Sequence, residues 1–172
     1  VIGNAMPDVT GGLNTTVTWK NVNLYLGFYY SLGGQIYNAA EHNRNMFKYT
    51  GTTPSPEVIH NMWLHPGDQA IYPRPYNDDY NNARMGNSFY LEDASFIRLQ
   101  NVRIAYDLPE NWIKKLRLKN INFYAFVNNA LTWTNYSGFD PEFSTSNPLQ
   151  VGKDSYRYPR KREYGIGFSA NF

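Results

Sequence analysis

The sequence has little of two residue types on which protein chemistry often depends, cysteine and histidine. It contains no cysteine, which excludes disulfide bonds and thiolate chemistry. Its three histidines, His42, His60 and His65, do not have the spacing of metal ligands. The net charge is only +2, and the basic clusters near 114–119 and 157–162 match no nucleic-acid-binding motif. We therefore expect neither a resident metal ion nor a nucleic-acid partner.

Long apolar runs are absent as well. No stretch reaches about 18 consecutive apolar residues, so the sequence predicts no transmembrane helix. This absence does not exclude a membrane, because barrel strands alternate lipid-facing and lumen-facing residues. Aromatic residues are abundant instead, with 15 Tyr, 10 Phe and 4 Trp. Aromatic girdles at the two membrane interfaces are typical of transmembrane barrels.

Alternation of apolar and polar residues is the strongest structural signal, and the final stretch shows it best. Residues 164–172 place Tyr, Ile, Phe, Ala and Phe at even positions, with small or polar residues between them. This pattern predicts a β-strand with one apolar face. Similar patterns predict five strands in all, near 13–20, 23–37, 94–108, 116–134 and 158–172. In the third strand the alternation changes parity, and a β-bulge near Gln100 and Asn101 would restore it.

The connections between these strands alternate between short and long. Short turns are expected near Asn21 and Pro109, and long loops over 38–93 and 135–157. Transmembrane barrels have short periplasmic turns and long extracellular loops. On that basis Phe172 should lie at the periplasmic rim.

Five strands cannot close a barrel, because the smallest single-chain barrels have about eight. Unpaired strand edges are also not tolerated within a bilayer. We therefore expect an all-β fold in which these antiparallel strands are the carboxy-terminal part of a large transmembrane β-barrel. The chain begins with Val1, which fits a processed chain or a piece of a longer protein.

The two faces of the predicted strands have different expected environments. Lipid-facing side chains are expected at Leu24, Leu26, Phe28, Tyr164, Ile166 and Phe168. Side chains that line the lumen or touch an internal plug are expected at Asn122, Tyr124, Asn128 and Thr132. Because a soluble sandwich can also end on an alternating strand, a soluble β-rich glycan-binding module remains an alternative.

Several short motifs give the sequence a family resemblance. They are Ile2-Gly3-Asn4, Gly11 to Thr16 with Trp19-Lys20-Asn21, Gly33 to Asn38, Ala94 to Val102 with Tyr106 to Pro109, Asn128 to Thr132 with Tyr136 to Glu142, and Tyr158-Pro159 before the last strand. Together they resemble the carboxy-terminal end of SusC-like (RagA-like) TonB-dependent outer-membrane transporters of Bacteroidetes. The resemblance covers nearly the whole chain and is weakest over 39–93.

The resemblance implies a barrel of about 22 strands in the bacterial outer membrane, with an internal plug. It implies import of a glycan or peptide beneath a SusD-like surface lipoprotein, driven by the TonB complex. The plug and the TonB box are not in this sequence. The terminal Phe172 resembles the signal that the barrel-insertion machinery recognises. A SusC-like barrel that acts as a structural subunit of an outer-membrane assembly remains an alternative to transport.

No catalytic constellation is visible, and we expect no enzymatic activity. The acidic residues Asp140 and Glu142 suit loop turns better than acid–base catalysis, and so do Asp78 and Asp79. Oxygen ligands such as Asp78 and Asp79 could nevertheless hold Ca²⁺ in an outer loop.

Aromatic residues of the long loop are the candidate substrate-binding residues. They are Trp63, Tyr72, Tyr76 and Tyr80. Aromatic faces suit stacking on a sugar or contact with a peptide. The alternative is that these rings pack the loop against itself or against the lipoprotein.

Overall fold

The chain is described by a computed structural model over residues 3–45, 53–74, 87–115, 118–142 and 151–171. Segments far apart in the sequence combine into two compact units. The sheet unit consists of Pro7–Gly33, Ser95–Asn135 and the residues from Pro159 onward. The loop unit consists of Gly34–Ala94 and Tyr136–Tyr158, together with the residues up to Met6.

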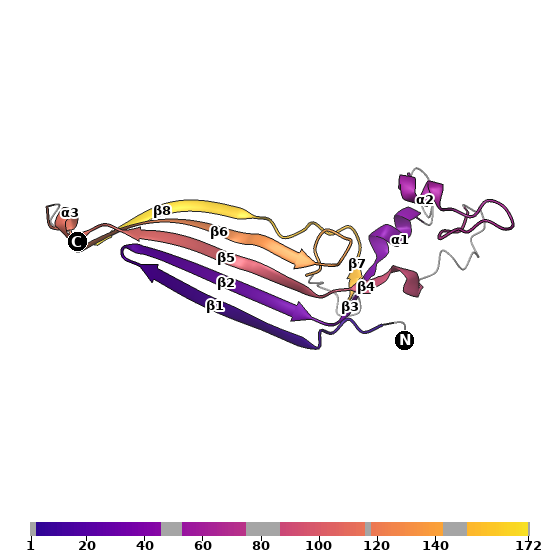
Figure 1. Cartoon of the computed structure of the whole chain (residues 1–172), viewed down its shortest axis with the longest axis horizontal. Helices are drawn as coiled ribbons and strands as arrows, with labels where there is room; N and C mark the ends of the chain where they lie inside the picture. The colour runs from indigo at the N-terminus through magenta and orange to yellow at the C-terminus, as the bar shows by residue number, and fades with distance from the viewer. Residues whose placement is uncertain (1–2, 46–52, 75–86, 116–117, 143–150, 172) are drawn as a thin grey trace. The chain divides into compact units, whose positions relative to one another are not determined.

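The sheet unit is a five-stranded sheet in the order β1-β2-β5-β6-β8, in which every neighbouring pair is antiparallel (Figure 1). Its strands are β1 (Val9–Trp19), β2 (Val22–Leu32), β5 (Phe96–Asp107), β6 (Asn120–Thr134) and β8 (Glu163–Asn171). A short helix, α3 (Glu110–Lys115), lies in the connection between β5 and β6. The mostly antiparallel, strand-rich fold agrees with the fold class expected from the alternation.

The loop unit contains a small three-stranded sheet in the order β4-β3-β7 and short helices. Its elements are β3 (Gln35–Asn38), α1 (Ala39–Asn45), α2 (Pro56–His60), the 3₁₀ helix η2 (Ser88–Tyr90), β4 (Leu91–Asp93) and β7 (Lys153–Asp154). Ile36 and Val58 are fully buried in this unit, and Tyr90 and Tyr136 are nearly so. The segments expected as long loops therefore contain an ordered core of their own.

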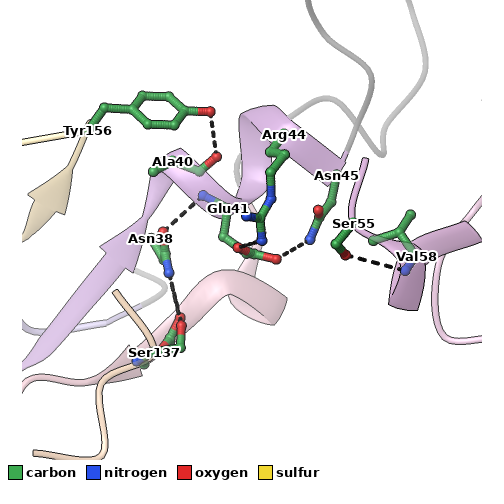
Figure 2. Close-up of polar contacts among 10 residues, drawn as sticks. Asn38, Ala40, Glu41, Arg44, Asn45, Ser55, Val58, Ser137 and Tyr156 are labelled. Carbon is green, nitrogen blue, oxygen red and sulfur yellow. Dashed lines mark hydrogen bonds and ion pairs between the residues drawn. The ribbon is translucent and has the colours of Figure 1, made fainter. Parts of the chain in front are cut away.

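Side-chain caps begin both α-helices of the loop unit (Figure 2). The Oδ1 atom of Asn38 accepts a hydrogen bond of 2.9 Å from the backbone N–H of Glu41. Ser55 Oγ accepts one of 3.4 Å from the N–H of Val58, and Pro56 occupies the first turn of α2. These side chains satisfy backbone donors that have no partner within a helix, which is why such short helices can form here.

Several strand boundaries differ from those that the alternation predicts, and β6 and β8 begin only at Asn120 and Glu163. The strand expected over 23–37 is interrupted at Gly33 and Gly34, whose φ angles are 75° and 78°. This left-handed conformation is readily adopted by glycine, and it ends β2 before β3 begins. The first strand was expected to begin near residue 13. It begins at Val9, because Val9 pairs with Leu32.

The register of the sheet shifts where the parity of the sequence changes. The β2–β5 pairing shifts between Gly27 and Phe28, and the β5–β6 pairing shifts between Leu99 and Asn101. The β-bulge predicted near Gln100 and Asn101 is thus confirmed. It returns Ile97 and Leu99 to the same face as Val102.

A side chain added at Gly167 should destabilise the sheet. A Cβ atom there would meet the ring of Tyr124, which also lies 4.5 Å from the Arg103 guanidinium carbon. We expect Gly167→Val to lower the free energy of unfolding of the full-length protein by about 1–3 kcal/mol. Urea unfolding measures this, with Ser169→Val on the same strand as the matched control. Equal unfolding midpoints for the two variants would contradict the close packing.

Candidate functional site

The side chains of one face of the sheet unit, here called the apolar face, form cross-strand rows. At the end of the β1–β2 turn, a turn-end row contains Trp19, Val22, Tyr106, Phe123 and Phe168. At the opposite end, a loop-end row contains Gly11, Tyr30, Ile97 and Trp133. The three rows between them are largely aliphatic, with Leu24, Leu26, Ile104, Val127 and Ile166 among their members.

This face is strongly exposed in spite of its composition. Ile166 is 89% exposed, Phe168 70% and Trp19 69%. A patch of this kind marks a surface that contacts another apolar phase. The two aromatic-rich rows are eight residues apart along β1, or about 27 Å of strand. With a barrel-like tilt this spans about 20 Å, which is comparable to the apolar band of a transmembrane barrel between its aromatic girdles.

The opposite, polar face has a hydrogen-bonded hub near the turns at Asp107. Its carboxylate accepts hydrogen bonds of 2.8 Å from both Asn23 and Asn122, so it joins β2, β5 and β6. Its backbone carbonyl accepts a third, of 2.9 Å, from the side chain of Asn21. The hub fixes the strand ends relative to one another and leaves the Asp107 carboxylate with two side-chain donors.

Farther from the turns, cations and rings pack together on the polar face. Arg98 is only 1% exposed, donates a 3.0 Å hydrogen bond to Thr132 Oγ1 and lies 5.2 Å from the ring of Phe96. The Arg103 guanidinium lies over Tyr124, whose ring stacks near that of Phe126. These contacts pack the guanidinium groups of both arginines against aromatic rings of the sheet.

All four residues predicted to line the lumen lie on the polar face. Asn122 donates to Asp107, Asn128 to Glu163 at 3.3 Å, and Thr132 accepts from Arg98. Tyr124 lies beneath Arg103. The six residues predicted to face lipid lie on the apolar face. The structure thus separates the two sets, while their environments stay a prediction.

A buried polar network holds the loop unit together. Tyr136 donates a 2.7 Å hydrogen bond to the Asp154 carboxylate, and both residues are 5% exposed. Glu92 accepts bonds from Ser137 Oγ and from Asn38, which links β4 to β3 and to the segment after β6. Figure 2 shows how Asn38 contacts both Ser137 and the start of α1.

Burial, together with the Asp154 carboxylate, raises the pKa of the Tyr136 phenol above its ordinary value of 10.0. The neutral phenol is therefore the form that the fold favours. Its contribution to stability is complete below about pH 10 and is lost as the pH rises toward the folded-state pKa.

The candidate substrate-binding aromatics have different environments. Tyr72 is 9% exposed and packs edge-on against Phe89, so it contributes to the core of the loop unit. Trp63 is 36% exposed, and the guanidinium of Arg74 lies 5.5 Å from its ring. Tyr76 and Tyr80 lie outside the described residues. A ligand-binding role for this set stays a prediction.

Metal-ligand clusters and membrane-crossing helices are both absent from the part of the chain that the structure describes. Within the ranges that it describes, no three His, Cys, Asp or Glu side chains are grouped as metal ligands. The Ca²⁺ candidates Asp78 and Asp79 lie outside those ranges, as does Phe172. No helix among the described residues is long and apolar enough to cross a membrane.

Sequence reasoning did not single out Asp107, Arg98 or Arg103. For Asp107 a signal was present, because an acidic residue at the end of a predicted strand has asparagines on both neighbouring strands. The burial of Arg98 has no comparable local signal, since it depends on residues brought together only by the fold.

Comparison with known proteins gives matches over the whole chain. A TonB-dependent receptor of Formosa agariphila is 33% identical over 174 aligned positions, which cover 100% of this chain and 17% of that receptor. TonB-dependent receptor SusC of Bacteroides thetaiotaomicron is 25% identical over 96% of this chain and 15% of its own length. The chain thus spans less than a fifth of these relatives. No family model matches it.

Solved structures show the same relationship. The RagAB peptide importer in its open-open state matches with a TM-score of 0.74 and 25% identity, over 98% of this chain and 17% of that chain. A second structure, of the RagAB peptide transporter, matches with a TM-score of 0.78 and 24% identity, over 98% and 18%. The fold is therefore that of a segment of a large barrel wall. Within that class, the chain resembles SusC-like (RagA-like) TonB-dependent receptors over its whole length.

Removing the phenol of Tyr136 should loosen the loop unit. Tyr136→Phe leaves a buried Asp154 oxygen without its donor, which we expect to cost about 1–3 kcal/mol of local stability. Hydrogen exchange of the purified full-length receptor should show faster exchange in β3, α1 and β7. Tyr158→Phe is the matched control, because that side chain is 98% exposed. Unchanged exchange in Tyr136→Phe would contradict the role of this bond.

Proposed function

We propose that this chain forms part of the wall of an outer-membrane importer. The observation that carries the proposal is an exposed apolar face between two aromatic-rich rows, with a polar face on the same five strands. Such a sheet suits a barrel with lipid outside and a polar lumen inside. The whole-chain similarity to TonB-dependent receptors supports the same location, because members of this family are outer-membrane proteins.

In this arrangement the polar face lines the lumen. Asn122, Tyr124, Asn128 and Thr132 then contact the plug or passing cargo, and the long connections over 38–93 and 135–157 are the extracellular loops. Trp63, with Arg74 beside it, offers a ring face for cargo at that side. Short turns such as Lys20–Asn21 lie on the periplasmic side, where the chain end at Phe172 serves as an insertion signal for the barrel-assembly machinery.

The cargo is a peptide or a glycan, and a SusD-like surface lipoprotein covers the barrel. Similarity to the RagAB peptide importer supports a peptide, and similarity to SusC supports partnership with such a lipoprotein. Energy comes from the TonB complex through a part of the receptor outside this chain. We assign no catalytic step to any of its residues.

Energy-dependent import is the direct test of this proposal. Deleting the full-length receptor gene in its native bacterium should abolish uptake of a labelled peptide or oligosaccharide that the intact strain imports. A protonophore should stop uptake but leave surface binding, since TonB-dependent transport uses the inner-membrane proton gradient. Uptake that survives either treatment would contradict an importer role. Loss of outer-membrane integrity without any loss of uptake would favour a structural subunit.

Charges placed on the apolar face should weaken the barrel. Phe28 and Ile166 lie one row to either side of the central row, so they fall near the bilayer midplane. We expect Phe28→Arg and Ile166→Arg each to cost about 2–4 kcal/mol of folding free energy in lipid vesicles. Ser169→Arg on the polar face of β8 is the control and should cost much less. Equal costs for Ile166→Arg and Ser169→Arg would refute the lipid assignment.

A further inference from the structure

The apolar face contains a depression of about 580 Å³ near its turn end. Ala125 forms the floor, since it is the one small side chain in a row that also carries Val17, Leu24, Ile104 and Ile166. A surface that only needed to contact bulk lipid would gain more buried apolar area from a larger residue here. The small side chain instead leaves room for a ligand.

Aromatic and aliphatic side chains make the wall of this depression. Ile104 and Ile166 flank Ala125 on the two neighbouring strands, and Tyr106 belongs to the lining as well. Phe123 and Phe168 lie on its turn side, with their ring centroids 6.3 Å apart. The volume is that of a small-molecule pocket, and a lining of this composition fits a hydrocarbon chain.

Cations lie at the same end of the sheet. The Lys20 ammonium is 5.1 Å from the centre of the Trp19 ring, and Trp19 pairs with Val22, which lines the depression. Lys119 directly precedes β6 and is exposed. The connection over 109–119, which includes Lys119, has four basic residues against one Glu in the sequence. The Asp107 carboxylate lies on the other face, where asparagines bind it.

We infer that the depression binds one acyl chain of an anionic phospholipid, whose phosphate group lies at the turn end beside Lys20 and Lys119. An apolar slot next to a basic rim is complementary to such an amphipathic ligand, and long lysine stems reach the interface from an apolar surface. The site goes beyond import. It rests only on the membrane location proposed above.

Native mass spectrometry of the purified full-length receptor tests this assignment. The probes are dioleoyl phosphatidylglycerol and dioleoyl phosphatidylcholine, added separately to the receptor in detergent. The wild type should retain phosphatidylglycerol in preference to phosphatidylcholine. Ala125→Phe fills the depression and should lower retention of phosphatidylglycerol by about tenfold. The double variant K20Q/K119Q should lose the preference but still retain some of either lipid.

Leu13→Phe is the matched control, because it adds the same ring to the apolar face on β1, outside the depression. It should retain lipid like the wild type, and all variants should import cargo normally, since none alters the polar face. Equal retention by Ala125→Phe and the wild type would overturn the site. Retention without headgroup preference would overturn the anionic assignment. A wild-type dimer that Ala125→Phe converts to monomer would show that a second copy occupies the depression.

The proposed membrane location and the proposed lipid site can each be contradicted by a different result. If Ile166→Arg costs no folding free energy, the location itself is wrong. If that cost is observed but lipid retention does not depend on Ala125, only the lipid site is wrong.

Discussion

Backbone register is the constraint on which the sheet unit depends. Strands that cross a bilayer must keep their N–H and C=O groups paired, yet their apolar side chains must also stay on the outer face. The sheet satisfies both demands because β5 and β6 contain extra, bulged residues over a distance that fewer residues of β2 span. Between two shared rows, β2 advances two residues from Leu26 to Phe28, β5 three from Leu99 to Val102, and β6 four from Val127 to Leu131. A left-handed residue, Asn129 with φ of 54°, lies within the longest of these steps.

The two units provide hydrogen-bond partners for their polar groups in different ways. On the polar face of the sheet, charged and amide side chains from neighbouring strands satisfy one another, as Asp107 does with Asn23 and Asn122. In the loop unit, the strands are only two to four residues long, so backbone hydrogen bonds between strands satisfy few of its polar groups. There Tyr136, Asp154 and Glu92 join segments that lie far apart in the sequence. Buried networks of this kind specify one arrangement because a lost partner is costly.

Alternation was sufficient to predict the five strands of the sheet and both of its faces, because side-chain direction follows directly from a period of two. It could not predict the end of β2, since Gly33 and Gly34 interrupt a run whose pattern continues into β3. Nor could it predict β4 and β7, whose short segments have no period and pair through tertiary contacts. For the candidate site, the residues of the polar face could be predicted, because alternate residues of a strand point to opposite faces. The roles of Arg98 and Asp107 did not, because they depend on neighbours across strands.

The outer strands of the sheet impose a last requirement. Among the described residues β1 and β8 each pair on one side only. In water such edges can be solvated, but in hydrocarbon each free N–H or C=O costs several kcal/mol. In the proposed location both edges must therefore pair with further strands, and the relatives, of which this chain covers 17%, have ample length to supply them. The stability of this wall is then a property of the closed barrel, since the hydrogen bonds that complete β1 and β8 come from outside the chain.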